Sequence, residues 1–243
     1  MLKLSIKILL KTGKKLKMNV IAIDGSSATG TGTLGSKLAQ VYDFAYLDTG
    51  ALYRGVAFEL LNAGVDVSDE KEAVRVAKSL SPEKMLSLQN ESGIRNETCG
   101  KAASVISAFP AVREALFDFQ RRFAENPIKQ DGTQAKGAIL DGRDIGTVIC
   151  PEAKWKVFLT ASAEIRAKRR FKELQFKGLC VIYDDVLSDI QARDKRDSER
   201  STAPLRPADD AFILDTSDLT ADDVYARVVD YMNERNKQVP EKV

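Results

Sequence analysis

Short apolar runs alternate with stretches of helical periodicity along most of the chain. The run at residues 20–23 is continuously apolar and rich in β-branched residues, and it stops at Asp24 and a glycine-rich turn. Such runs are typical of strands that are buried on both faces of a sheet. We expect strands at residues 20–23, 45–47, 138–140, 155–159 and 212–214. Strands that alternate with helices predict an α/β fold, with a parallel five-stranded sheet flanked by helices.

Helical periodicity fills most of the remaining chain. We expect helices at residues 33–42, 51–63, 70–79, 100–124, 162–176, 182–200 and 221–236. Pro110 is expected to interrupt the fourth of these, because proline breaks the backbone hydrogen-bond ladder. Residues 126–136 form a predicted loop, and the pattern fades into short pieces between residues 81 and 98. The length of 243 residues fits one large domain, in which residues 65–98 are the best candidate for a small insertion.

Composition excludes several classes of protein. No run approaches roughly 18 uncharged apolar residues, so no membrane span is predicted. The chain has no histidine, which excludes Ser-His-Asp and Cys-His catalysis. Its three cysteines are widely spaced, so neither a disulfide framework nor a Cys/His zinc site is expected. These features predict a reduced, cytoplasmic setting, and no metal-binding residue is expected in the chain.

Charge is distributed unevenly along the chain. Residues 1–17 carry six lysines and no acidic residue, which leaves 31 basic and 35 acidic side chains, a net charge of −4, in residues 18–243. A domain of that charge is a poor non-specific binder of nucleic acid. Residues 1–17 are interpreted as a disordered basic extension, or as a stretch upstream of a start at Met18, and residues 18–243 as the single working domain. No nucleic-acid or membrane partner is expected, and nothing in the sequence requires more than a monomer.

The turn after the first predicted strand has the layout of a phosphate-binding loop. In the pattern G-x-x-x-x-G-K-[ST], glycines let backbone N–H groups surround phosphate oxygens at the start of a helix. Gly25 and Gly30 have the required spacing, but position 31 is threonine instead of lysine. Glycine-rich turns after strands are also common as purely structural features, so the loop alone is an ambiguous signal. The loop residues are Gly25, Ser26, Ser27, Ala28, Thr29, Gly30, Thr31, Gly32 and Thr33.

Arginines concentrate on two predicted helices near the end of the chain. Arg193, Arg196, Asp197 and Arg200 follow one another at i, i+3, i+4 and i+7, which places them on one helical face. Arg166, Arg169 and Arg170 are likewise predicted to share one face of the preceding helix. Solvated charged faces are the simpler explanation, but the planar guanidinium group suits bidentate binding of phosphate. The acidic turn at residues 141–144 follows a buried strand, where ligands bind in open α/β sheets. These features together indicate phosphoryl transfer.

Five separate motifs now support a family resemblance. They are Asp48-Thr49-Gly50 with Tyr53-Arg54, Ala102-Ala103-Ser104, Phe109-Pro110 with Val112-Arg113, the sequence DGRDIGT at residues 141–147, and RDKRD at residues 193–197 followed by Arg200. In this order and spacing the chain resembles the cytidylate kinase family, part of the nucleoside monophosphate kinase group of P-loop proteins, over nearly its whole length. The resemblance implies the P-loop nucleoside monophosphate kinase fold, with a small CMP-binding insertion and a lid at about residues 162–178.

The resemblance also implies roles for individual residues. Residues 25–33 would surround the phosphates of ATP, which enters with Mg²⁺. The residues implied to bind CMP are Asp48, Thr49, Arg54, Ser104, Arg113, Arg143, Asp144, Arg193, Asp197 and Arg200. Among them Arg54, Arg143 and Arg200 would hold the acceptor phosphate, Ser104, Arg113 and Asp144 would recognise the base, and Arg193 and Asp197 would contact the pentose. The residues implied to act in catalysis are Arg143, Asp144, Arg170 and Arg193. Helix capping by Asp48 and simple packing by Ser104 remain as alternatives.

Two departures from the family pattern affect the expected function. Residues 65–98 look shorter than the insertion that most of the family carries, and Thr31 cannot supply the positive charge of the lysine that bridges the ATP phosphates. Loss of such a group costs roughly 10²–10³-fold in rate. The main hypothesis is therefore ATP-dependent phosphorylation of CMP or dCMP to CDP or dCDP, weakened by Thr31. The alternatives are a nucleotide-binding pseudokinase that keeps the CMP pocket, and a related kinase with a different base preference.

Overall fold

The computed structural model describes residues 19–81, 84, 88, 92–129 and 131–238. The basic stretch at residues 1–17, for which the sequence predicts a disordered extension, lies outside the described residues.

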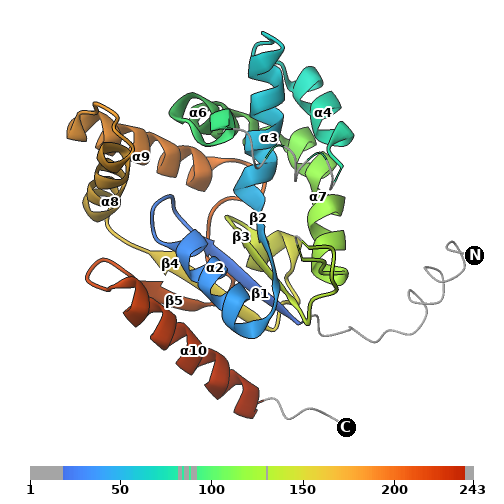
Figure 1. The fold of residues 1–243 in the computed structure, drawn as a ribbon, viewed down its shortest axis with the longest axis vertical. Helices are drawn as coiled ribbons and strands as arrows, with labels where there is room; N and C mark the ends of the chain where they lie inside the picture. Colours follow the sequence, from blue (N-terminus) through green and yellow to red (C-terminus); the bar gives the residue numbers. More distant parts are fainter. Residues whose placement is uncertain (1–18, 82–83, 85–87, 89–91, 130, 239–243) are drawn as a thin grey trace, which may run out of the picture.

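Five parallel strands form one sheet in the described part of the chain (Figure 1). The strands are β1 (Val20–Gly25), β2 (Ala45–Asp48), β3 (Ala138–Gly142), β4 (Trp155–Thr160) and β5 (Phe212–Asp215). Their order is β2-β3-β1-β4-β5, and each neighbouring pair is parallel. All five predicted strands are confirmed. The glycine-rich loop leaves the central strand β1, because β1 lies between β3 and β4.

Helices connect these strands close to the predicted boundaries. They are α2 (Thr31–Tyr42), α3 (Thr49–Asn62), α4 (Glu70–Ser79), α6 (Glu97–Ile106), α7 (Pro110–Glu125), α8 (Ala163–Phe176), α9 (Tyr183–Glu199) and α10 (Ala221–Gln238), with a 3₁₀ turn η1 (Ser92–Arg95) and a π-helical turn η2 (Ile145–Ile149). The single interrupted helix predicted at residues 100–124 is wrong. The structure has two helices there, and Pro110 is the first residue of α7, where its missing N–H costs no intrahelical bond.

Both faces of the sheet are covered, which explains why its strands are continuously apolar. On one face Ile21 and Ile23 pack with Leu34 and Leu38 of α2 and with residues of α10. On the other face Val20 and Ala22 pack with the end of α7 and with η2. The strands therefore alternate their side chains between two apolar layers.

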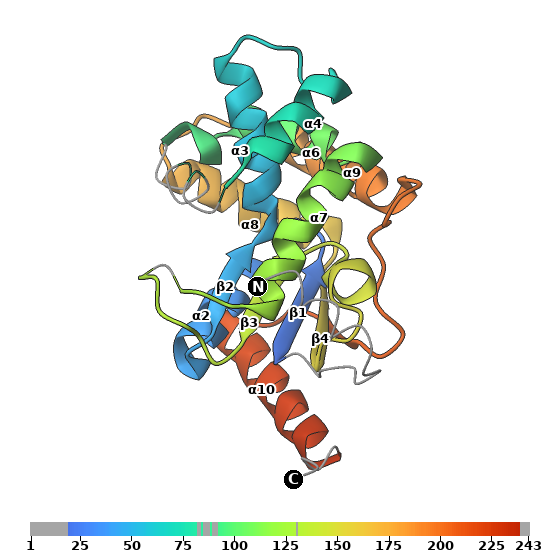
Figure 2. The same cartoon turned by 90° about the vertical axis from the view of Figure 1, so that its right-hand side faces the viewer.

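Two further helical groups lie beyond the carboxyl ends of the strands (Figures 1 and 2). One has its own core, formed by α3, α4, α6 and the first half of α7. The other is the pair α8–α9, which packs around Ala167, Leu174, Val186 and Ile190. The expected insertion at residues 65–98 includes α4 and η1, and residues 82–83, 85–87 and 89–91 of it lie outside the described residues. Residues of both groups line one cavity together with Ser27 and Ala28 of the glycine-rich loop.

Candidate active site

The loop between β1 and α2 is shaped by close backbone contacts. A Cβ atom on Gly25 would lie 2.5 Å from the carbonyl oxygen of Leu159, so only glycine fits there. Gly30 has φ of 100°, the left-handed conformation, and it caps the start of α2. The hydroxyl of Thr29 donates to the carbonyl of Ser26 at 2.8 Å, which closes the turn. The first N–H groups of α2 have no intrahelical acceptor, and they form an anion-binding end of the helix.

A cavity opens beside this loop, at the carboxyl ends of the strands. It encloses about 830 Å³ of empty space, part of it open to solvent. The structure brings most of the predicted site residues to its wall: Ser26, Ser27, Ala28, Thr31, Asp48, Thr49, Arg54, Arg113, Arg143, Asp144, Arg193, Asp197 and Arg200. These residues come from five separate stretches of sequence, so the predicted convergence of the arginines is observed.

The other predicted site residues lie outside this cavity wall. Ser104 and Arg170 line an adjoining cavity, which shares Ser27 and Arg193 with the first. The buried hydroxyl of Ser104 accepts a hydrogen bond from Nε of Arg196 at 3.2 Å. The loop residues that do not face the cavity are Gly25, Thr29, Gly30, Gly32 and Thr33.

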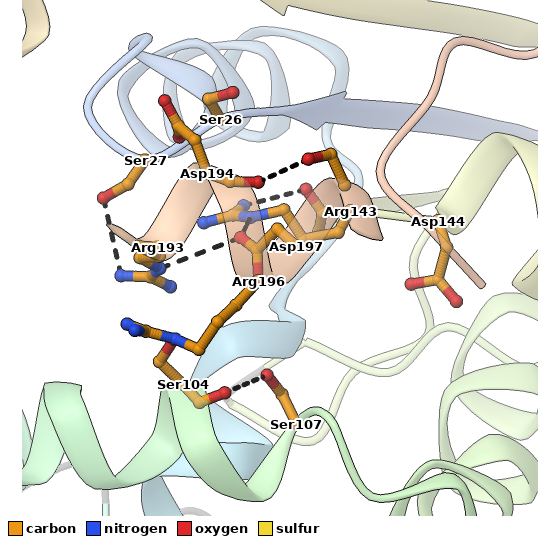
Figure 3. Close-up of polar contacts among 12 residues, drawn as sticks. Ser26, Ser27, Ser104, Ser107, Arg143, Asp144, Arg193, Asp194, Arg196 and Asp197 are labelled. Carbon is orange, nitrogen blue, oxygen red and sulfur yellow. Dashed lines mark hydrogen bonds and ion pairs between the residues drawn. The ribbon is translucent and has the colours of Figure 1, made fainter. Parts of the chain in front are cut away.

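Arginine and aspartate side chains pair at the cavity wall, and Figure 3 shows the pair of Arg143 and Asp197. Nη2 of Arg113 lies 2.5 Å from Oδ2 of Asp144, and Nε of Arg143 lies 3.0 Å from Oδ2 of Asp197. Burial opposes ionisation of Asp197, but Arg143 and its neighbouring arginines outweigh burial and hold the pKa of Asp197 below its ordinary value. The pairs fix Arg113 and Arg143 in place before any ligand arrives, as a preorganised site requires.

Three arginines at the cavity are less well compensated. Burial lowers the pKa of Arg54 and of Arg200, and it lowers the pKa of Arg193 to about 10 with help from the nearby positive charge of Arg143. Nε of Arg193 and Nη2 of Arg200 are buried without a hydrogen-bond partner among the described residues. Buried donors of this kind favour an anionic ligand, because a phosphate would supply the missing acceptors.

The cavity wall also carries the acidic residues Asp48 and Asp141, and Asp141 lies close to Thr31. Asp141 is the penultimate residue of β3, and it accepts a hydrogen bond from the hydroxyl of Tyr46 at 3.1 Å. Burial and the neighbouring carboxylate of Asp48 raise the pKa of Asp141. Asp48 occupies the N-cap position of α3, but its side chain makes no capping hydrogen bond, which argues against the capping alternative. Mg²⁺ prefers oxygen ligands, usually one or two carboxylates together with substrate phosphates, and Asp48 and Asp141 fit that description.

The three arginines of α8 do not share one free face, contrary to the sequence interpretation. Arg166 is buried and forms two hydrogen bonds to the carboxylate of Asp194, at 3.0 and 2.5 Å. Arg169 donates to the hydroxyl and the carbonyl of Thr216. Arg170 pairs with Glu97 of α6 and with Glu173. Of the three, Arg170 reaches a candidate ligand cavity.

Sequence reasoning missed Asp24 as a site residue. Asp24 is buried at the end of β1, and its two carboxylate oxygens accept the backbone N–H groups of Ile145 and Gly146, each at 2.8 Å. This carboxylate therefore holds the turn that presents Arg143 and Asp144 to the cavity. The available signal was its position, as the first polar residue after the first apolar run.

The parallel sheet, the glycine-rich loop after its central strand and the arginine-lined cavity define a kinase fold of the P-loop class. The family model for cytidylate kinase matches residues 21–234. The chain therefore belongs to the cytidylate kinase family.

Curated relatives agree with this assignment. The cytidylate kinase of Paramagnetospirillum magneticum (strain ATCC 700264 / AMB-1) is 52% identical over 207 residues, which cover 85% of this chain and 94% of the relative. The cytidylate kinase of Rhodospirillum rubrum is 47% identical over 219 residues, covering 90% of this chain and 99% of the relative. Among solved structures, the shikimate kinase of Bacteroides thetaiotaomicron aligns with a TM-score of 0.44 at 13% identity, covering 88% of this chain and 98% of that one. The family assignment rests on the sequence matches.

Proposed function

We propose that this protein transfers the γ-phosphoryl group of MgATP to CMP or dCMP and releases CDP or dCDP. The observation that carries the proposal is the cavity in which the glycine-rich loop and Arg54, Arg143 and Arg200 face one shared space. Membership of the cytidylate kinase family supports CMP as the acceptor. Membership of this family does not favour the alternative of a pseudokinase.

On the donor side, the backbone N–H groups at the start of α2 would bind the phosphates of ATP. Mg²⁺ bound with ATP would neutralise phosphate charge, and Asp48 and Asp141 are the carboxylates placed to hold it. On the acceptor side, Arg54, Arg143 and Arg200 would hold the phosphate of CMP. Phosphoryl transfer needs little covalent chemistry from the protein, so positioning and charge neutralisation account for most of the catalysis.

Base recognition would fall to Arg113 and Asp144, which are already paired. A carboxylate can accept a hydrogen bond from the amino group of cytosine, and a base without that group would leave a buried acceptor unpaired. Ser104 would contribute through its O–H, because the hydrogen bond from Arg196 uses only an acceptor site of the hydroxyl oxygen. Asp197 and Arg193 would contact the pentose. Helix α8 would serve as the lid at about residues 162–178, excluding water from the reaction and bringing Arg170 toward the transferred phosphoryl group.

Steady-state kinetics with a coupled assay of ADP release would test this function. We expect turnover with CMP and dCMP to exceed turnover with AMP, UMP and GMP. We also expect Thr31→Lys to raise the rate, because it restores a cation to the phosphate loop. Equal rates with AMP and CMP would contradict the roles of Arg113 and Asp144. A fast wild-type enzyme that gains nothing from Thr31→Lys would contradict the proposed effect of Thr31.

We further propose a single kinase domain at residues 18–243, a monomeric state, a cytoplasmic location and no nucleic-acid or membrane partner. The three cysteines are free thiols, which supports a reducing compartment. Along residues 19–238, apart from the short undescribed gaps, no helix has the length and apolar character of a membrane span. Deleting residues 1–17 should leave phosphorylation of CMP intact. A large loss of activity would contradict the proposed domain boundary.

A further inference from the structure

Position 31 is where the phosphate-loop pattern requires a lysine, and this chain has threonine there. The structure shows that this position faces the candidate ligand cavity, so the missing positive charge affects the site directly. Thr31 is the first residue of α2, it is buried, and it lines the same cavity as Ser26 and Ser27. A hydroxyl at this place carries no charge, and the carboxylate of Asp141 lies close by. Position 31 therefore supplies no positive charge to the donor side of the cavity.

Most nearby cations are already committed to carboxylates. Lys37 of α2 pairs with Asp222 at 2.6 Å, away from the loop. Arg143 is bound to Asp197. Arg166 touches the carbonyl of Ser27 at 3.4 Å, but its guanidinium group already donates two hydrogen bonds to the carboxylate of Asp194.

Arg193 of α9 differs from these groups. Its Nη1 lies 3.5 Å from the hydroxyl oxygen of Ser27, so the guanidinium group reaches the phosphate loop from the opposite wall (Figure 3). Its nearest carboxylate, Asp197, is 3.8 Å away from Nε and is shared with Arg143. Nε has no hydrogen-bond partner among the described residues although it is buried. Arg193 is thus a cation beside the loop with donors still to be satisfied.

The net charge of the cavity wall also favours an anionic ligand near Arg193. The wall carries five arginines and four aspartates, a formal charge of +1 when all are ionised. Burial, and then the positive charge of Arg143, lower the pKa of Arg193, so an anion placed against it would relieve repulsion as well as satisfy donors. Arg193 lines both this cavity and the adjoining one under α8. It therefore stands between the loop and the proposed lid.

We infer that Arg193 supplies to the phosphates of ATP the positive charge that position 31 lacks. The inference rests on the proposed function in taking ATP as the phosphoryl donor, and it adds a donor-side role to the pentose contact proposed for Arg193. A guanidinium group binds phosphate through two parallel N–H groups, so it can replace an ammonium group without occupying the same position.

A double-mutant cycle tests whether Arg193 provides the positive charge that a lysine at position 31 would otherwise provide. The four proteins are the wild type, Thr31→Lys, Arg193→Gln and the double variant, and the measurement is MgATP affinity by titration calorimetry without an acceptor. We expect Arg193→Gln to weaken MgATP binding by about tenfold or more in the wild-type background. In the Thr31→Lys background the same change should cost at most about threefold, because the lysine then provides the charge. Equal losses in both backgrounds would overturn the inference.

Controls separate this role from others. Arg54→Gln, on the acceptor side, should lower affinity for CMP and should not be rescued by Thr31→Lys. Arg193→Lys keeps the positive charge and should lose less MgATP affinity than Arg193→Gln, which guards against a variant that merely folds poorly.

If Arg193→Gln changes only the KM for CMP, the pentose contact is its whole role and the donor-side inference is wrong. Because the MgATP titration needs no acceptor, it can succeed or fail independently of CMP phosphorylation, which is measured by turnover.

Discussion

At the scale of single residues, the carboxylate of Asp24 connects the two sides of the candidate site. It ends the strand that leads into the phosphate loop, and it binds the backbone of the turn that carries Arg143 and Asp144. Both of its oxygens act as acceptors for N–H groups. A residue with two acceptor oxygens is needed for this geometry, which a neutral amide cannot reproduce.

Replacing Asp24 with asparagine should therefore disturb the acceptor side without touching it directly. The amide NH₂ would face a backbone N–H, leaving one buried donor unsatisfied at a cost of about 1–3 kcal/mol in the free energy of unfolding. A shift of the turn by about 1 Å should lower kcat/KM for CMP roughly 100-fold. Urea unfolding and steady-state kinetics would measure both effects. Asp66→Asn is the matched control, because Asp66 also accepts a backbone N–H but is exposed, and it should change neither quantity appreciably.

Asp24 should also make stability depend on pH. Burial raises its pKa from 3.8 to about 7, against the opposing effect of the N–H groups of Gly146 and Ile145. The folded protein therefore holds an extra proton between about pH 4 and 7, and the free energy of unfolding should fall as pH rises through this range, by up to about 4 kcal/mol. Urea unfolding at pH 5 and pH 8 should give a smaller difference for Asp24→Asn than for the wild type. Identical differences would show that Asp24 ionises normally.

At the scale of elements, two ion pairs join the α8–α9 pair to α6. Arg170 pairs with Glu97, and Lys101 pairs with Asp189 at 2.7 Å. The partner of Arg170 matters for function, because Arg170 is proposed to move toward the transferred phosphoryl group. Glu97 would compete with that phosphoryl group for the same guanidinium.

Glu97→Gln should therefore improve ATP binding. Partly exposed ion pairs contribute about 0.2–1 kcal/mol, so the KM for ATP should fall by up to about fivefold, while stability changes little. Asp189→Asn breaks the other pair without freeing a site arginine, and its KM for ATP should stay at the wild-type value. A rise in KM for Glu97→Gln would indicate that the pair holds the lid in its binding position.

The pattern of the sequence predicted nearly every helix and strand, because apolar periodicity reports which face of an element is buried. The sequence pattern failed to predict segments whose backbone conformation depends on tertiary contacts. Pro110 reads as an interruption of one helix, yet it starts a second helix that packs against the sheet. The π-helical turn Ile145–Ile149 has no sequence signal of its own, and its N–H groups are held by Asp24, a residue 121 positions away from Ile145.

At the scale of the whole molecule, the chemistry of the site could be predicted from the sequence. The contacts that each arginine makes with other residues could not. The types and order of the arginines pointed to phosphate binding, and the family resemblance assigned them to ATP and CMP. The spacing of residues along the chain could not show that Arg166 forms an ion pair with Asp194, or that Arg193 of α9 lies next to Ser27. Such pairings depend on how the helical groups sit above the sheet, and that arrangement is set by packing between distant segments.

Because the cavity is lined by residues from α3, α7, α9 and the turn after β3, a ligand that fills it should stabilise the whole domain. CMP at about 100 times its Kd should add about 2.7 kcal/mol to the free energy of unfolding, which raises Tm by roughly 5–10 °C for a domain of this size. Cytidine lacks the phosphate that Arg54, Arg143 and Arg200 are proposed to hold, so at the same concentration it should raise Tm far less. Thermal unfolding followed by circular dichroism would compare the two ligands. An equal rise with cytidine would mean that the three arginines do not bind the acceptor phosphate, because the phosphate would then add nothing to the stability of the complex.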